Sequence, residues 1–160
     1  MRLTPLALQE IGAFGANWTH RAIITPTDIT MATADTEQVF VLLTTQSQDQ
    51  IAGAAMLLDV PFQNTADAAY NTTTIRIGDI DTDNKFVTAT EMNLNGTEVY
   101  YAYNTGANVP TAYGATAKTI IVTLGAQSAK SLTSLNVGRV IILIKFLRPS
   151  NLELKPTSTG

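Results

Sequence analysis

From His20 onward the chain consists of eight short runs of β-branched or alternating residues, and this pattern constrains the fold more than any other feature. Clusters of Gly, Asn, Asp and Pro, which favour turns, separate the runs. The runs span residues 20–25, 38–45, 50–60, 72–77, 85–91, 98–103, 117–124 and 135–147. None of them keeps the 3.6-residue apolar period of an amphipathic helix. The pattern therefore predicts an all-β protein with short antiparallel strands.

Eight strands in two packed sheets is the strand number of a jelly roll, so we predict a jelly-roll-like antiparallel β-sandwich. In the run 72–77, Thr73, Ile75 and Ile77 alternate on one face, as a half-buried strand requires. An immunoglobulin-like sandwich is the alternative fold, although the chain has no cysteine pair to support it. We expect three parts: an extended N-terminal arm (residues 1–19), the sandwich domain (20–148) and an extended C-terminal segment (149–160).

Two of the runs, 38–45 and 135–147, are apolar on both faces near their centres. In the first, Val39 alternates with Phe40 and Leu42, and in the second, Ile141 and Leu143 alternate with the β-branched residues Val140, Ile142 and Ile144. A strand of this kind is covered on both sides, either by a packed loop of the same chain or by a neighbouring subunit. We favour a neighbouring subunit and predict that these five side chains contribute to an interface.

Four tyrosines lie close together in the sequence, at positions 100, 101, 103 and 113. Tyrosine is common in protein cores and in interfaces, and it also stacks on sugars. Alternation along a strand explains neighbouring tyrosines as one core and one surface residue, so we favour ordinary packing. Subunit contact and ligand stacking stay open as alternatives. Tyr101 and Tyr103 complete the set of interface candidates.

Composition excludes several classes of partner. Charged residues make up only 14% of the chain, and its 25 threonines supply much of the polar surface while favouring strands. A net charge of −3 without a cluster of Lys or Arg argues against a nucleic-acid partner. The longest apolar stretches, such as 52–60, are far shorter than the roughly 20 residues of a membrane-spanning helix. The N-terminus does not resemble a secretion signal. We therefore expect a protein made in the cytoplasm, with no membrane or nucleic-acid partner.

The residues that usually carry catalysis are scarce. The chain has no cysteine and one histidine, His20, which stands at the start of the first run, where a structural or interfacial role is favoured. Its six serines lie in polar loop or tail contexts without a Gly-x-Ser-x-Gly motif. A glycosidase needs only two carboxylates, and the sequence alone leaves that possibility open. We predict that the protein is not an enzyme and needs no cofactor.

One acidic cluster resembles the first half of a calcium-binding loop. Asp79, Asp81 and Asp83 alternate, as oxygen ligands do at the start of such a loop. Asn84 replaces the glycine of the sixth position and Thr90 replaces the glutamate of the twelfth. Asp and Asn also form ordinary turns, because their side chains accept hydrogen bonds from nearby backbone N–H groups. We favour a plain turn and keep the three aspartates as weak calcium candidates.

Several segments together resemble small head-associated and fibre-associated proteins of tailed bacteriophages. These segments are Ile51-Ala52-Gly53, Val60-Pro61-Phe62, Ile75-Arg76-Ile77-Gly78-Asp79-Ile80-Asp81-Thr82-Asp83 with Lys85-Phe86, and Val137-Gly138-Arg139-Val140. The resemblance implies a jelly-roll-like sandwich that forms a symmetric homo-oligomer, often a trimer, on the capsid surface of the virion. It implies a capsid decoration (cement) protein that binds and stabilises the shell of major capsid protein. The alternative is a tail, head-fibre or receptor-binding module, in which loops 93–96 and 104–116 contact a glycan or another virion protein.

Overall fold

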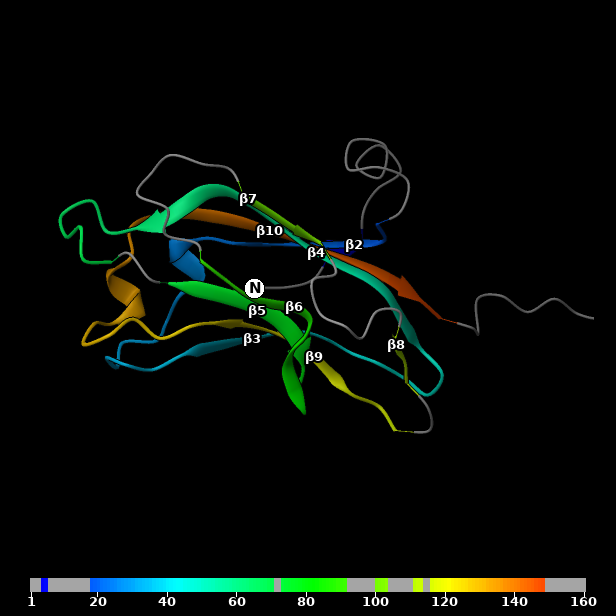
Figure 1. The fold of residues 1–160 in the computed structure, drawn as a ribbon. Helices are drawn as coiled ribbons and strands as arrows, with labels where there is room; N and C mark the ends of the chain where they lie inside the picture. The colour runs from blue at the N-terminus through cyan, green and yellow to red at the C-terminus, as the bar shows by residue number, and fades with distance from the viewer. Residues whose placement is uncertain are drawn as a thin grey trace, which may run out of the picture.

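The computed structural model describes residues 4–5, 18–70, 73–91, 100–103, 111–113 and 116–148. Ten strands and two short 3₁₀-helices make up this part of the chain (Figure 1). The strands are β1 (Thr4–Pro5), β2 (His20–Ile24), β3 (Gln38–Thr44), β4 (Gln50–Gln63), β5 (Thr74–Asp79), β6 (Thr82–Glu91), β7 (Tyr100–Tyr103), β8 (Thr111–Ala112), β9 (Thr119–Leu124) and β10 (Val137–Leu147). The helices are η1 (Pro26–Asp28) and η2 (Leu132–Ser134). No helix in these ranges is long and apolar enough to span a membrane.

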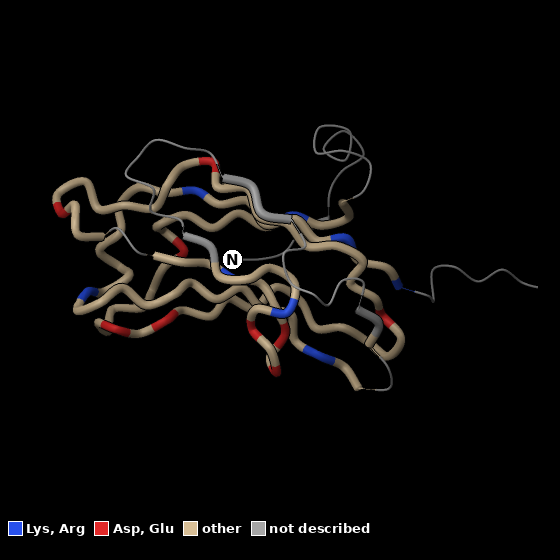
Figure 2. Tube along the Cα trace, viewed as in Figure 1, with Lys and Arg blue, Asp and Glu red and all other residues tan. Residues whose placement is uncertain are grey.

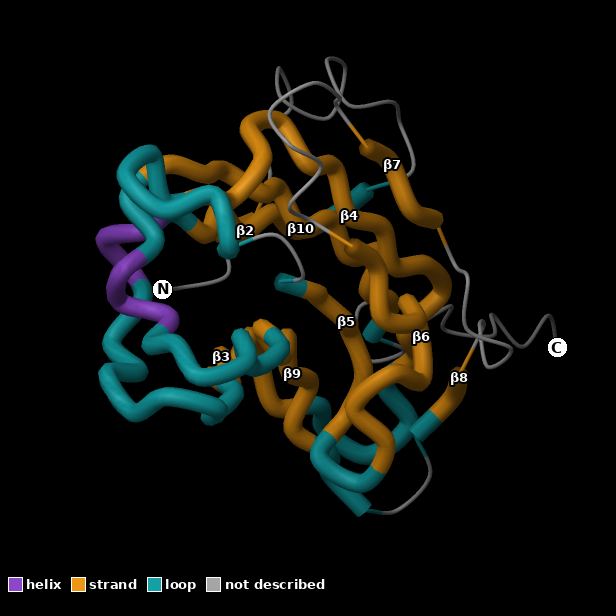
Figure 3. The backbone as a smooth tube through the Cα atoms, turned by 60° about the vertical axis from the view of Figure 1, so that its left-hand side comes forward, coloured by secondary structure: helices purple, strands orange, loops and turns teal. Residues whose placement is uncertain are grey.

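The strands form two antiparallel sheets that lie in separate layers (Figure 3). Sheet A has the order β1-β2-β10-β4-β7, with β8 also paired to β4, and sheet B has the order β3-β9-β5-β6. When the two-residue strands β1 and β8 are left out, the pairs nest as β2 with β10, β3 with β9, β4 with β7, and β5 with β6. Successive pairs of this nested set alternate between the two sheets, with β2–β10 and β4–β7 in sheet A and β3–β9 and β5–β6 in sheet B.

The nested pairing is the topology of a jelly roll and confirms the predicted all-β sandwich of about eight strands. With the two-residue strand β1 left out, an immunoglobulin-like sandwich would put the first two strands in one sheet, whereas β2 and β3 lie in different sheets. The predicted division into arms and domain stays a prediction, because residues 1–3, 6–17 and 149–160 lie outside the described residues. Within the N-terminal part, β1 pairs with β2 along the edge of sheet A.

The main core lies between the two sheets and follows from the alternation of each strand. In β3, Gln38, Phe40 and Leu42 are buried, whereas Val39 and Val41 point outward and are exposed. The largest fully buried side chains come from both sheets and from η2: Phe62, Phe86, Ile24, Ile51, Met56, Leu58, Ile75, Ile77, Ile120, Leu124 and Leu132. Burial of each such side chain contributes roughly 1.5–3 kcal/mol to the free energy of folding.

A second, smaller apolar cluster covers the outer face of sheet A. Trp18, Ala55, Ile141 and Leu143 are buried together there. The Trp18 ring lies against Gly53, where an added Cβ would be 3.4 Å from it, so the small residues of β4 make room for the indole. The two apolar faces of β10 are therefore covered within one chain. The predicted interface role of Ile141 and Leu143 is corrected accordingly, because these side chains are 6% and 3% exposed.

Candidate functional site: the outer face of sheet B

The most exposed apolar side chains of the described residues belong to sheet B and the hairpin that follows β5. Val39 and Val41 on β3 are 52% and 58% exposed, and Ile80, directly after β5, is 61% exposed. Val39 is paired through Thr123 of β9 with Arg76 of β5, and Val41 is paired through Ile121 with Gly78. Among the described strands, β3 lies at the edge of sheet B and is bonded only to β9. An apolar strip on a strand of this kind is a feature of protein-binding surfaces.

The exposed side chains of Val39 and Val41, which we call the β3 strip, border an ion-pair network that crosses sheet B. The Arg76 guanidinium reaches from β5 over β9 and lies 2.7 Å from Glu37, which precedes β3. The same group lies 2.6 Å from Asp83 of β6. Beneath this network Thr123 is only 1% exposed, and its Oγ1 has no hydrogen-bond partner within the described ranges. The network therefore shields the centre of the outer face of sheet B from solvent and leaves Val39 and Val41 of β3 exposed.

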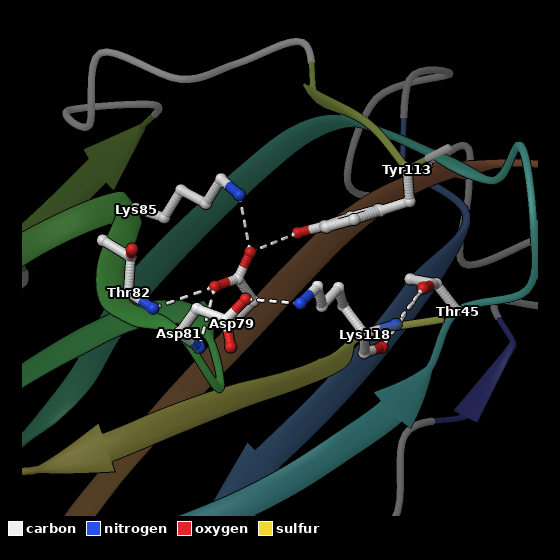
Figure 4. Close-up of polar contacts among 7 residues, drawn as sticks. All are labelled: Thr45, Asp79, Asp81, Thr82, Lys85, Tyr113 and Lys118. Atoms are coloured by element: carbon white, nitrogen blue, oxygen red, sulfur yellow. Dashed lines mark hydrogen bonds and ion pairs between the residues drawn. The ribbon is translucent and has the colours of Figure 1, made fainter. Parts of the chain in front are cut away.

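A buried carboxylate anchors the hairpin between β5 and β6 (Figure 4). The Asp79 side chain is 1% exposed and its Oδ2 accepts hydrogen bonds from Lys85 Nζ at 2.6 Å and from Tyr113 Oη at 2.9 Å. Its Oδ1 accepts from the backbone N–H groups of Asp81 at 3.1 Å and Thr82 at 2.9 Å. All four hydrogen bonds to the Asp79 carboxylate come from groups of the same chain. Asp79 therefore links the β5–β6 hairpin to Tyr113, which directly follows β8.

The electrostatics of this cluster favour a charged Asp79 beside a neutral Tyr113. Burial raises the pKa of the Asp79 carboxyl, but the hydrogen bonds from Lys85, Tyr113 and Thr82 lower it by more, so the pKa lies below its ordinary value. Burial and the hydrogen bond to Asp79 raise the pKa of the Tyr113 hydroxyl far above its ordinary value. Neither group is poised to exchange a proton near neutral pH. The arrangement therefore suits a structural contact better than acid–base chemistry.

The three calcium candidates each contact a different cation. Asp79 binds Lys85, Asp81 lies 2.5 Å from Lys118 Nζ, and Asp83 binds Arg76. No group of three or more His, Asp or Glu side chains that could hold a metal ion occurs in the described ranges. Figure 4 shows Asp79 and Asp81 pointing to separate partners, and Figure 2 shows the acidic positions of this hairpin along the backbone, with basic positions nearby. The alternation that suggested a calcium loop serves ion pairing here.

Gly78 has a steric role in the same hairpin. A Cβ at this position would lie 2.1 Å from the backbone oxygen of Thr82, so no larger residue fits without moving the hairpin. The ladder between β5 and β6 is irregular on both sides of Ile77. The close approach brings Asp83 over the outer face, where it meets Arg76.

The structure separates the predicted interface residues into three groups. Val39 is exposed on the outer face, as an interface residue must be. Phe40 and Leu42 are corrected, because each is 7% exposed and packs in the core between the sheets. The backbone of Tyr101 and Tyr103 pairs with β4, and the side chains of both lie outside the described residues.

The sequence pattern did not predict the roles that Val41, Ile80 and Tyr113 have here. The alternation of β3 already identified the face that Val41 shares with Val39. Ile80 lies between acidic residues of a predicted turn, where an exposed apolar side chain is not expected. The contact between Tyr113 and Asp79 joins residues 34 positions apart, so no local sequence pattern could predict that contact.

His20 has the structural surroundings that were expected. Its ring lies edge-on to Phe146, with 5.8 Å between the ring centroids, and its Nδ1 is 2.9 Å from Thr19 Oγ1. Burial and the nearby charge of Arg148 lower the pKa of the imidazole. Arg148 itself binds the buried Asp49 carboxylate through two nitrogens, each 3.0 Å from an oxygen. This pair fixes the end of β10 beside the loop that follows β3.

No protein-family model and no curated protein matches the chain. Among solved structures, the chain is similar to one described as "Acidic stable capsid structure of Helicobacter pylori bacteriophage KHP30". The TM-score is 0.45 at 12% sequence identity, and the alignment covers 81% of this chain and 94% of that chain.

Proposed function

We propose that this chain is a structural protein of a tailed-phage virion that binds the capsid shell as a decoration or cement protein. One observation carries the proposal: an edge strand of a jelly roll displays Val39 and Val41 outward, each more than half exposed. Jelly rolls build capsid and lectin domains, among others, and the sequence segments quoted above resemble head-associated proteins. An exposed apolar strip beside an edge strand is suited to binding another protein.

The mechanism we propose is stabilisation by mass action. A protein that binds two neighbouring capsid subunits, and binds them only in the assembled lattice, adds its binding free energy to the lattice. At a free concentration of 100 times Kd this contribution is about 2.7 kcal/mol for each site. A rigid sandwich suits this task because little conformational entropy is lost on binding.

We also propose that the chain acts without catalysis and without a cofactor. The buried carboxylates that carry the strongest contacts, Asp49 and Asp79, each bind a cation of the same chain and hold loops in place. Their role is accounted for by the fold. The ionic groups around the β3 strip, such as Glu37 and Arg76, are available to add rim contacts in an interface.

The test is binding to virus particles. Purified protein is mixed with phage particles that lack it, and the particles are sedimented at increasing protein concentration. We expect saturable binding with a fixed number of copies per particle, and a higher temperature of capsid disruption. Val41→Lys should weaken binding, whereas Val60→Lys, which changes an exposed valine of β4, should not. Saturation without any change in capsid stability would contradict the cement role, and binding to host glycans but not to particles would contradict the proposal altogether.

A further inference from the structure

The backbone of β3 offers unpaired hydrogen-bonding groups at Val39 and Val41. In an antiparallel strand, the N–H and C=O groups of one residue point to the same side of the strand. Those of the next residue point to the other side. The Thr45 N–H binds Lys118 O at 2.8 Å, whereas Thr119 O accepts from Ile80 at 2.9 Å, so even-numbered residues of β9 face β3 and odd-numbered ones face β5. The bond from Gly125 N–H to Thr74 O, 2.8 Å long, follows the same rule.

This rule fixes the orientation of the β3 backbone. Phe40 is paired with Val122, an even-numbered residue, so its backbone groups bind β9. Val39 and Val41 are paired with Thr123 and Ile121, so their N–H and C=O groups point away from β9, toward the free edge. No other strand of the described chain pairs with β3. Four backbone groups and two exposed valine side chains therefore lie together at this edge.

Residues 38–41 of β3 carry none of the features that usually protect an edge strand. Natural edge strands are usually blocked by charged residues, proline or a bulge. The strand Gln38–Thr44 contains no charged residue and no proline, and its ladder irregularity falls only after Val41. The seven residues exceed the length of the very short strands that make an edge safe.

We propose that β3 pairs with β3 of a second copy of this chain across a two-fold axis. The inference rests on the proposed function, because it names the partner that binds the same exposed strip. With Phe40 on the axis, Val39 of each copy lies opposite Val41 of the other, and both pairs exchange two backbone hydrogen bonds. A shift by two residues would bring in Leu43, which is paired with Ile120 and so uses its groups on β9. The opposite shift, with Val39 on the axis, would also satisfy the four groups, but it would put the charged Glu37 opposite Val41 of the other copy, whereas the first register pairs the two exposed valines with each other.

The charges at the two ends of the edge are ion-paired within each chain, Glu37 with Arg76 and Lys118 with Asp81, and they allow the antiparallel arrangement of two copies. Glu37 lies at one end of β3, and its carboxylate is 45% exposed. Lys118 lies at the other end, where its backbone binds Thr45. Antiparallel pairing brings the acidic end of each copy beside the lysine-bearing end of the other and keeps the two acidic ends apart. The resulting assembly is two-fold, unlike the trimer that the sequence resemblance implied.

The first test measures the mass of the full chain in solution by sedimentation, from low to high micromolar concentration and without particles. We expect a monomer–dimer equilibrium in which Val41→Lys raises the dimer Kd at least about 10-fold, because each dimer contains the change twice. Val60→Lys is the matched control and should leave Kd unchanged. A wild-type chain that is monomeric at every concentration, or a Val41→Lys chain with unchanged Kd, would overturn the inference.

The second test checks the register. The chain has no cysteine, so Val39→Cys and Val41→Cys chains each carry one thiol. The predicted pairing puts these two positions about 5.5 Å apart between Cα atoms, within disulfide range. Mild oxidation of a mixture of the two chains should give far more covalent dimer than either chain alone. Equal yields in all three samples would contradict the register.

The outcomes separate this inference from the proposed function. A monomeric chain that saturates particles overturns the dimer and leaves the virion role intact. A dimer that binds no particle supports the pairing of β3 and overturns the virion role. A monomeric chain whose binding to particles is lost in Val41→Lys would assign the β3 edge to a capsid protein instead of a second copy.

Discussion

Replacement of Asp79 by alanine tests how the β5–β6 hairpin is held. The carboxylate is buried and accepts four hydrogen bonds, two from side chains and two from the backbone. Its removal leaves the buried Tyr113 hydroxyl without an acceptor, which costs roughly 1–3 kcal/mol by itself. The loss of the ion pair with Lys85 adds to this, although Lys85 is 23% exposed and regains water. The total falls at about 3–5 kcal/mol, as for other buried pairs that lose one partner.

Urea denaturation followed by circular dichroism measures this loss in the free energy of unfolding. Asp81→Ala is the matched control, because it changes an aspartate two residues away whose carboxylate is 58% exposed. We expect the control to be indistinguishable from the wild-type chain. Tyr113→Phe removes one of the four hydrogen bonds and should cost about 1 kcal/mol. An Asp79→Ala chain as stable as the Asp81→Ala chain would refute the view that a buried carboxylate anchors this hairpin.

Three further predictions concern stability. Phe40→Ala should cost about 3–5 kcal/mol in a urea titration and Val41→Ala no more than about 0.5 kcal/mol, and equal costs would contradict the assignment of their faces. Gly78→Ala should cost roughly 1–3 kcal/mol, because the added methyl group meets backbone, and an unchanged melting temperature would contradict the close approach. The pKa values of Asp49 and Asp79 lie below the ordinary 3.8, so the unfolded chain takes up protons first and the melting temperature should fall as the pH drops below about 4. A constant melting temperature from pH 5 to pH 3 would contradict this.

The sequence was sufficient to predict the fold, because the strands are short and their alternation is clear. The predicted run 38–45 became β3 (Gln38–Thr44), and the run 50–60 became the first part of β4. The predicted run 72–77 ends two residues before β5 (Thr74–Asp79) does, because Gly78 and Asp79 are typical of turns. Local sequence pattern does not show that a buried lysine contact and a distant tyrosine keep Asp79 within a strand.

The interface was predicted less well, and for a physical reason. Two apolar faces on one strand show that both faces are covered, but not by which part of the chain. In β10 the cover is Trp18, which lies more than 120 residues away in sequence and packs against Gly53 of a neighbouring strand. In β3 one face packs in the core and the other is open. Only the arrangement of the sheets, with β3 at an edge, distinguishes the two cases.

Electron cryomicroscopy of virions tests the central claim most directly. We expect a symmetric reconstruction of the head to contain density for a two-sheet jelly roll of this chain, repeated at fixed lattice positions and bound to the shell. The β3 strip of each copy should be covered by protein in that density. A complete, well-resolved head without this jelly roll, or with the β3 strip of every copy facing solvent, would contradict the account.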